Sequence, residues 1–235
     1  MIKIENVEVV GLDHAIRGMR NPKNSWDKSD SCYGCCDDNC NDCSVLRYEG
    51  CPAIPEYKVG PNDHGLMMRL SNGGPVHAKY RRMIVVYLDI TAPLYWWKEF
   101  DTYKVGTVAN SCSTMHKIHE KEFTLEDFSH EHLDEVSITL LEDLINHIND
   151  MRAWYNEIPV EDNFVAKKEK WWQMIQLLPS SYNQKRTIML SYEVLTNIYK
   201  WRKNHKLDEW CDFCKWIESL PYSEIITCEV KESED

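Results

Sequence analysis

Residues 83–90 have the sequence Met-Ile-Val-Val-Tyr-Leu-Asp-Ile and carry the strongest strand signal in the chain. The run is short, apolar and rich in β-branched residues, which favour the pleated backbone of a sheet. Residues 93–104, which follow, are aromatic and mixed and begin with Pro93, a residue type favoured in the first turn of a helix. The centre of the chain therefore predicts a strand that leads directly into a helix.

The residues on either side of this centre predict further strands and short helices. Residues 2–10 alternate apolar and polar side chains, which predicts a strand with one buried face. A short helix is expected next, with Asp13 as its N-cap, and another over residues 63–70. Residues 105–117 are small and polar and predict a loop or a short strand.

The second half of the chain is predicted to be helical. Residues 125–155 carry leucine and isoleucine at spacings of three to five, which predicts a long amphipathic helix with room for one break. Thr124-Leu-Glu-Asp, just before it, has the form of a capped helix start. Three more helices are expected over residues 162–177, 187–203 and 207–219.

Length and composition fit a globular protein with its own core. Of the 235 residues 43% are hydrophobic and 28% charged, and a chain of this length does not need disulfides to build a core. The strands and helices predict one α+β domain over residues 1–230. Residues 231–235 are expected to be a flexible tail.

The charge and the start of the sequence exclude some classes of partner. The net charge is 27 − 38 = −11, and nucleic acid is an unlikely partner because non-specific affinity for it comes mostly from Lys and Arg. No apolar run of 18 residues exists, so no membrane span is expected. The first residues lack the apolar segment of a signal peptide, which predicts a cytoplasmic protein.

Residues 21–62 form a long insertion without periodicity, and cysteines are the obvious candidates to organise it. Six of the ten cysteines lie between Cys32 and Cys51. Two Cys-x2-Cys pairs are a unit that places thiolates on a metal ion. Zinc, an iron–sulfur cluster and free or disulfide-bonded thiols all remain open. The candidate metal ligands are Cys32, Cys35, Cys40 and Cys43.

Three polar segments could bind an anion. Residues 178–186 are a hydroxyl-rich link with two cations, and could equally be a plain turn. Residues 103–117 combine hydroxyls, amides, Lys and His, which together suit a phosphate or the edge of a base, although a plain polar loop has the same composition. Residues 202–206, Arg-Lys-Asn-His-Lys, lie between two expected helices, where cations often only complement the helix dipole. Composition alone does not decide between these alternatives.

The order of features along the chain resembles a known family. Residues 73–77, Gly-Gly-Pro-Val-His, precede the central strand, and the polar run 103–117 follows the central helix. Leu178-Pro179 opens a later turn, and Arg202 ends the helix after it. In this order the features resemble the flavin-dependent thymidylate synthases, the ThyX family, and more loosely its phage and gut-bacterial members.

The sequence departs from the family at its basic motifs. The signature Arg-His-Arg-x7-Ser is matched by Tyr103-Lys104-Val105 and by Ser113, the eighth residue after Val105. The family's Asn-Ala-Arg is matched by Ser191-Tyr192-Glu193. Lys104 could supply one charge, but a lysine lacks the bidentate fork of arginine. The departures therefore concern activity more than fold.

The resemblance implies a fold, a reaction and an assembly. It implies an antiparallel or mixed sheet packed with long helices, and a homotetramer with sites shared between subunits. The implied reaction is the reductive methylation of dUMP to dTMP, with methylene-tetrahydrofolate as carbon donor, NADPH as hydride source and FAD as relay. In such an enzyme the protein positions flavin against uracil and need not supply a nucleophile.

The resemblance also assigns roles to seven residues. Ser113 would lie near the uracil ring, and Arg202 would contact the uracil carbonyls, so these two are the implied catalytic residues. The implied cofactor and nucleotide contacts are Tyr103, Lys104, Asn110, Ser111 and His205. Two alternatives remain: a ThyX-fold nucleotide-binding protein without thymidylate synthesis, and an interaction module organised by metal at Cys32–Cys51.

The cysteine cluster generates the first test. If the cluster is a zinc site, freshly reduced protein should carry about one equivalent of zinc by elemental analysis, because one tetrahedral site needs four ligands. The double variant Cys40→Ser/Cys43→Ser should lose that metal, whereas Cys228→Ser should keep it. Metal-free wild-type protein would contradict the metal interpretation.

Overall fold

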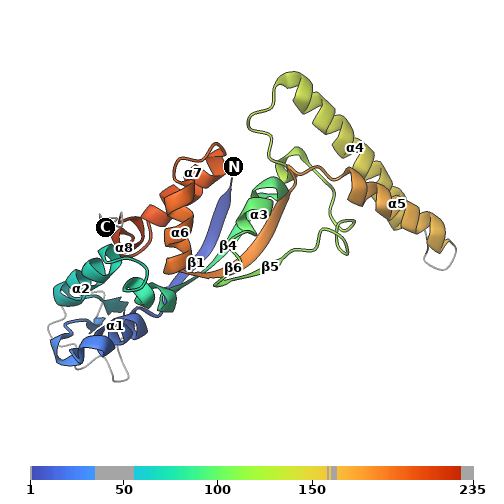
Figure 1. Ribbon diagram of the computed structural model, residues 1–235. Coiled ribbons are helices and arrows are strands. Elements are labelled where there is room, and N and C mark those ends of the chain that lie inside the picture. Colours follow the sequence, from blue (N-terminus) through green and yellow to red (C-terminus); the bar gives the residue numbers. More distant parts are fainter. Residues whose placement is uncertain (1, 35–55, 158, 160–162, 229–235) are drawn as a thin grey trace.

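The computed structural model describes residues 2–34, 56–157, 159 and 163–228 and has a four-stranded antiparallel sheet at its centre. The strand order is β1-β4-β6-β5, so β4 and β6 are the two central strands (Figure 1). The sheet confirms the expected α+β fold. Its strands are β1 (Lys3–Val10), β4 (Val85–Pro93), β5 (Thr107–Ser111) and β6 (Asn183–Ser191).

Buried and more exposed side chains alternate along the central strands, so that one face of the sheet lies in the core. Val86, Leu88 and Ile90 of β4 are at most 1% exposed, whereas Tyr87 between them is 45% exposed. Leu88 lies opposite Ile188 of β6, and Val86 lies opposite Leu190. Because cross-strand neighbours share a face, the apolar residues of both strands point to the same side.

Aromatic side chains fill the space between this face and its helices. Trp96 and Phe100 of α3 (Leu94–Phe100) meet Trp210 and Phe213 of α7 (Asp208–Glu218), with ring centroids of Trp96 and Trp210 4.7 Å apart. All four rings are at most 1% exposed. Such rings contribute large buried areas, so this cluster is a main source of hydrophobic stabilisation. Helix α6 (Tyr192–Arg202) packs beside α7.

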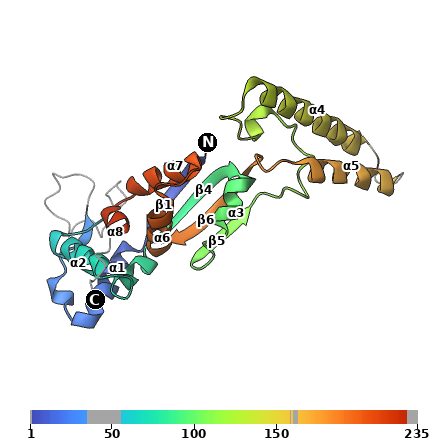
Figure 2. The same cartoon turned by 45° about the horizontal axis from the view of Figure 1, so that its top comes forward.

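The remaining elements lie at the two ends of the sheet (Figures 1 and 2). Helices α1 (Leu12–Arg20), α2 (Pro61–Asn72) and α8 (Glu224–Thr227) gather at one end. At the other end α4 (Glu135–Glu157) and α5 (Phe164–Leu177) form a helical hairpin, the arm, which has a small apolar cluster of its own. The shorter elements are β2 (Cys32–Gly34), β3 (Glu56–Lys58), and the 3₁₀ turns η1 (Asn21–Lys23), η2 (Trp26–Lys28), η4 (Ala78–Met83) and η5 (Leu125–Asp127).

The helix predicted over residues 187–203 is wrong in its first part. Residues 183–191 form β6, and only residues 192–202 are helical. In β6 Gln184, Ile188 and Leu190 are buried at the two-residue period of a strand, and Ser191 is buried where the strand meets α6. Pairing with both β4 and β5 decides the structure here, since Thr-Ile-Met-Leu has no strong preference of its own.

The long helix predicted from residue 125 begins later. The predicted capping box at Thr124 is present, but it caps only the single turn η5. Phe128 then forms a β-bridge with Tyr182, which takes the chain out of helical geometry. Helix α4 starts after Asp134, whose Oδ1 accepts the backbone N–H of Ser137 at 2.8 Å.

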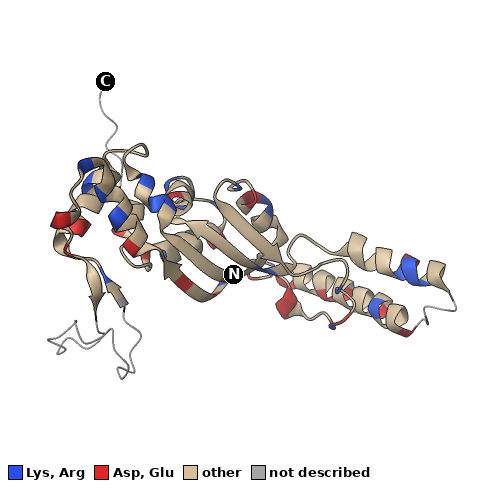
Figure 3. Ribbon diagram, turned by 90° about the horizontal axis from the view of Figure 1, so that it is seen from below, with Lys and Arg blue, Asp and Glu red and all other residues tan. Residues whose placement is uncertain are grey.

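Charged residues occur along the whole molecule, on the arm as well as at the α1–α2 end (Figure 3). No helix among the described residues is both long enough and apolar enough to cross a membrane.

A buried ion pair fixes the described parts of the cysteine-containing insertion. Arg20 Nε donates to Asp63 Oδ1 at 2.6 Å, and both side chains are almost fully buried. Asp63 Oδ2 accepts from the hydroxyls of Ser29 and Ser31 and from the backbone of Asp30 and Ser31. These bonds attach residues 29–31 to the start of α2, so this stretch of the predicted insertion is ordered by polar contacts.

Burial alone would raise the pKa of Asp63, but hydrogen bonds from Ser31, Ser29 and Arg20 outweigh it and hold the pKa below its ordinary value. The ionised carboxylate is therefore the form that stabilises the fold. Its contribution is present above the pKa that Asp has in the unfolded chain, and is lost as the pH falls through the lower folded pKa.

We expect Asp63→Asn to lower the free energy of unfolding by about 3–5 kcal/mol, because it leaves the Arg20 charge buried without its partner. Urea unfolding at neutral pH measures this change. Glu142→Gln, at an exposed position of α4, is the control and should leave the midpoint nearly unchanged. A small effect of Asp63→Asn would show that water replaces the pair.

Candidate functional site

A cavity of about 460 Å³ lies between η4, the loop after α3 and the first turns of α6. Its walls combine apolar side chains with a few polar groups, which is typical of small-molecule sites, and its volume is in their range. The lining residues are Pro75, Arg81, Thr102, Tyr103, Val105, Glu193, Val194, Thr196, Asn197 and Lys200.

The loop after α3 forms one wall because a glycine allows a close approach to α6. Gly106 has φ +81°, and a Cβ built there would lie 3.2 Å from Cγ2 of Val194. A side chain at this position would be strained in backbone and crowded against the helix. Tyr103 and Val105 are thereby placed at the cavity.

Two buried polar atoms of the cavity residues have no hydrogen-bond partner among the described residues. One is Nε of Arg81, whose side chain is 2% exposed, and the other is Oε2 of Glu193. A second nitrogen of Arg81 donates to Cys228 Sγ at 3.2 Å, and Arg82 lies 3.9 Å from Glu193 Oε1. Unpaired buried groups are costly, so each of these atoms calls for an explanation.

Glu99 of α3 connects three other elements beside the cavity. Its Oε2 accepts from Arg202 at 2.6 Å and from the indole of Trp210 at 3.1 Å, and His205 Nε2 lies 3.5 Å away. Arg202 Nε also donates to the hydroxyl of Tyr103 at 3.0 Å. The structure thus brings together Tyr103, Arg202 and His205, three of the residues predicted from sequence.

The other predicted residues lie along β5 and beyond it. Lys104 lines a separate cavity of about 290 Å³ with Tyr103, Thr107 and Ala109. Asn110 and Ser111 are exposed on β5, where Asn110 lies opposite Thr187. The hydroxyl of Ser113 accepts the backbone N–H groups of Met115 and His116, so it caps a turn. Their predicted ligand contacts remain predictions.

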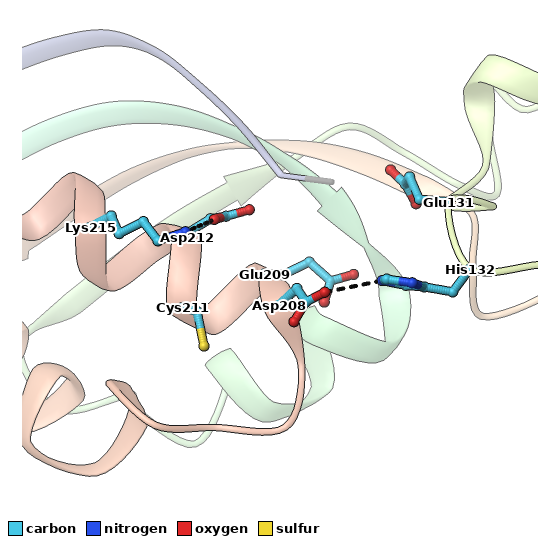
Figure 4. A pocket seen from close by; sticks show the side chains of 7 residues that line it. All are labelled: Glu131, His132, Asp208, Glu209, Cys211, Asp212 and Lys215. Atoms are coloured by element: carbon cyan, nitrogen blue, oxygen red, sulfur yellow. Dashed lines mark hydrogen bonds and ion pairs between the residues drawn. The ribbon is translucent and has the colours of Figure 1, made fainter.

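A second cavity, of about 370 Å³, is acidic (Figure 4). In it His132 pairs with Asp208 at 3.2 Å, and Lys215 pairs with Asp212 at 3.0 Å. Glu209 is buried and accepts the hydroxyl of Tyr95. Burial and this carboxylate raise the pKa of Tyr95 to about 12. The carboxylates thus have protein partners.

The predicted metal site falls mostly outside the described residues. Of its four ligands only Cys32 is described, and it is exposed in β2. Cys35, Cys40 and Cys43 lie outside the described ranges. Within those ranges no group of three or more His, Cys, Asp or Glu side chains is arranged to hold a metal ion. Cys214 of α7 is buried, and burial raises its pKa to about 12.

Sequence analysis missed Arg81, Lys200 and Glu99. Arg81 belongs to an Arg-Arg pair directly before the central strand, a signal that could have been noticed. Lys200 and Glu99 lie on helices and belong to no motif that the sequence displays. Only the tertiary structure places Lys200 at the cavity and Glu99 beside Arg202 and Trp210.

Glu99→Gln should lower the free energy of unfolding by about 1–2 kcal/mol, because a neutral amide weakens hydrogen bonds from Arg202 and Trp210 that now reach a charged acceptor. The matched control is Asp101→Asn, which breaks the more exposed ion pair with Arg186 and should cost about 0–1 kcal/mol. Equal losses in the two variants, measured by urea unfolding, would contradict a special role for Glu99.

No family model and no curated protein matches the sequence. Two solved structures of ThyX from Helicobacter pylori, each with FAD and dUMP, are similar to this chain at a TM-score of 0.60 and 15% identity. The match to the first structure covers 97% of this chain and 98% of that one. The match to the second structure covers 99% of this chain and 100% of that one. At this identity the likeness concerns the fold alone, and the chain has a fold similar to that of the flavin-dependent thymidylate synthase ThyX over nearly its whole length.

Proposed function

We propose that the protein is a ThyX-like enzyme that methylates dUMP reductively to dTMP, with methylene-tetrahydrofolate, NADPH and FAD. The observation that carries this proposal is the full-length likeness of fold to ThyX structures that contain FAD and dUMP. The cavity supports it, because its wall includes Tyr103, Val105 and Glu193 from the two segments that match the family's motifs.

The residues of the cavity fit a phosphate-bearing aromatic ligand. Pro75, Val105 and Val194 provide apolar walls against which a ring can pack. Lys200 supplies a charge for a phosphate, as a point charge and without the fork of arginine. Thr102 and Thr196 add hydroxyls to the walls of the same cavity. The donor set therefore suits a nucleotide or the corresponding part of a flavin.

When bound, FAD supplies the hydride transfer that the side chains of this chain do not provide. The protein binds the ligands and orients them. Arg202 holds the hydroxyl of Tyr103, and Glu99 in turn holds Arg202, so this network fixes the position of Tyr103 at the cavity. Because Glu99 offsets its charge, Arg202 acts in this proposal as a positioning residue for Tyr103.

A second candidate is a nucleotide-binding protein without thymidylate synthesis. Glu193 favours it, since this residue lines the cavity and the sequence resemblance matches it to the arginine of the family's Asn-Ala-Arg. The sequence also replaces the basic residues of Arg-His-Arg. Such a protein would bind a pyrimidine nucleotide but would not retain flavin.

A spectrum and an assay on the full-length protein distinguish the two candidates. For the enzyme we expect flavin absorption bands in anaerobically purified protein, and dTMP formation from dUMP with NADPH and methylene-tetrahydrofolate. Nucleotide binding without flavin or dTMP supports the second candidate. A protein that binds neither flavin nor any of a panel of pyrimidine nucleotides that includes dUMP would overturn both.

Lys200→Met should weaken dUMP binding by about tenfold, since it removes a charge-assisted contact worth about 1.5 kcal/mol. The control Lys206→Met makes the same change of charge at an exposed position that does not line the cavity. Calorimetric titration of both variants tests this. Equal affinities would place the phosphate elsewhere.

A further inference from the structure

The outer face of the arm leaves large apolar side chains in contact with solvent. On α4, Val136 and Leu140 are 79% and 70% exposed, and on α5, Val165 and Trp172 are 66% and 43% exposed. Because residues four or seven positions apart share one face of a helix, the first two form one apolar row and the last two form another. Apolar rows of this kind on a protein surface mark sites of interaction.

The two helices of the arm differ in length, which leaves the start of α4 uncovered. Helix α4 has 23 residues and α5 has 14, so α4 is longer by about 13 Å at about 1.5 Å per residue. Figures 1 and 2 show that α4 continues past the C-terminal end of α5. Val136 and Leu140 lie in this overhang, where α5 does not shield them from water.

The two helices also differ in charge. Helix α4 has one Arg and five Asp or Glu, a net charge of 1 − 5 = −4, and α5 has three Lys and one Glu, a net charge of 3 − 1 = +2. Asp143 follows Leu140 on the exposed row of α4, and Lys168 lies between Val165 and Trp172 on the row of α5. Neither Asp143 nor Lys168 has an ion-pair partner among the described residues. Each helix therefore presents an apolar row with one available charge, and the two charges are opposite.

We propose that the arm pairs with the arm of a second copy of this chain, antiparallel, so that α4 of each copy packs on α5 of the other. This arrangement places the overhang at the base of one arm beside the tip of the other, where α5 begins. Asp143 then meets Lys168 of the partner subunit, and Leu140 packs against Trp172 of the partner subunit. Because the pair has two-fold symmetry, each of these contacts occurs twice.

Size and charge both favour a second copy as the occupant of this face. Helices about 35 Å and 21 Å long and about 10 Å wide offer on the order of 550 Å² per copy, which meets the roughly 1,000 Å² in total that a specific interface needs. A membrane of anionic lipid would attract Lys168 but repel the net negative charge of α4, whereas a second copy complements both helices. The pairing uses residues of the arm alone and does not rest on the proposed function.

Charge reversal tests the pairing, because like charges then meet in both contacts of the symmetric pair. Lys168→Glu alone and Asp143→Lys alone should each weaken self-association of the full-length protein by about tenfold, measured by sedimentation velocity over a range of concentrations. An equimolar mixture of the two variants should associate as the wild type does, since opposite charges meet again in both contacts of a mixed pair. Both positions are exposed, so the variants should fold.

Matched controls make the same changes away from the arm. Lys23→Glu and Asp27→Lys, at exposed positions of η1 and η2, should leave self-association unchanged, alone and mixed. Leu140→Ser tests the apolar row and should weaken association without a change of charge. Val76→Ser removes an equally exposed side chain, 69% against 70%, outside the arm and should have no effect.

The pairing is wrong if the wild-type protein stays monomeric at micromolar concentrations, if the two reversals leave its association unchanged, or if their mixture associates no better than either variant alone. Binding of a wild-type monomer to vesicles of phosphatidylcholine and phosphatidylserine, with loss of that binding in Lys168→Glu, would assign the face to a lipid surface and would also overturn the pairing.

Discussion

One carboxylate oxygen, Oε2 of Glu99, holds together the elements on which the candidate site depends. Donors from α7 and from the end of α6 converge on it, and through Arg202 it also reaches the loop after α3. The guanidinium of Arg202 lies 4.8 Å above the ring of Trp210, so the charged contacts and the aromatic cluster stabilise the same arrangement. Together with the close approach of Gly106 to Val194, this junction fixes the loop that carries Tyr103 relative to α6.

The sequence predicted elements whose pattern is local and missed those that tertiary pairing decides. The alternation in residues 2–10 and the apolar run before Pro93 were sufficient for β1 and β4. The second half of β6, residues 187–191, was predicted as helix, because its sequence is ambiguous until β4 and β5 pair with both edges of the strand. The capping box at Thr124 shows a similar limit. The motif is present as predicted, but the helix it caps is a single turn, because Phe128 then forms a β-bridge with Tyr182.

The same distinction applies to the candidate site. Tyr103, Arg202 and His205 were found because the order of motifs resembles a family, and they lie together in the structure. Arg81 was missed because it differs from other arginines by its burial, and no short sequence motif predicts a guanidinium that is buried without a full set of hydrogen bonds. The cost of such groups is a loss of folding stability that a ligand can recover, which is why they are more informative about binding than exposed charges are.

The arm also bears on how the sheet assembles. It lies in the sequence between β5 and β6, and its base is closed by the Phe128–Tyr182 bridge and by the bond from Ser129 N–H to the carbonyl of Ser181. Its contacts, between α4 and α5 and within an apolar cluster that also includes Ile118, Phe123 and Phe128, join residues of the single stretch between β5 and β6. A hairpin that forms early from such local contacts shortens the effective loop that must close before β6 can pair with β5. The arm is thus an entropic aid to folding of the sheet, whatever it contacts once the protein is folded.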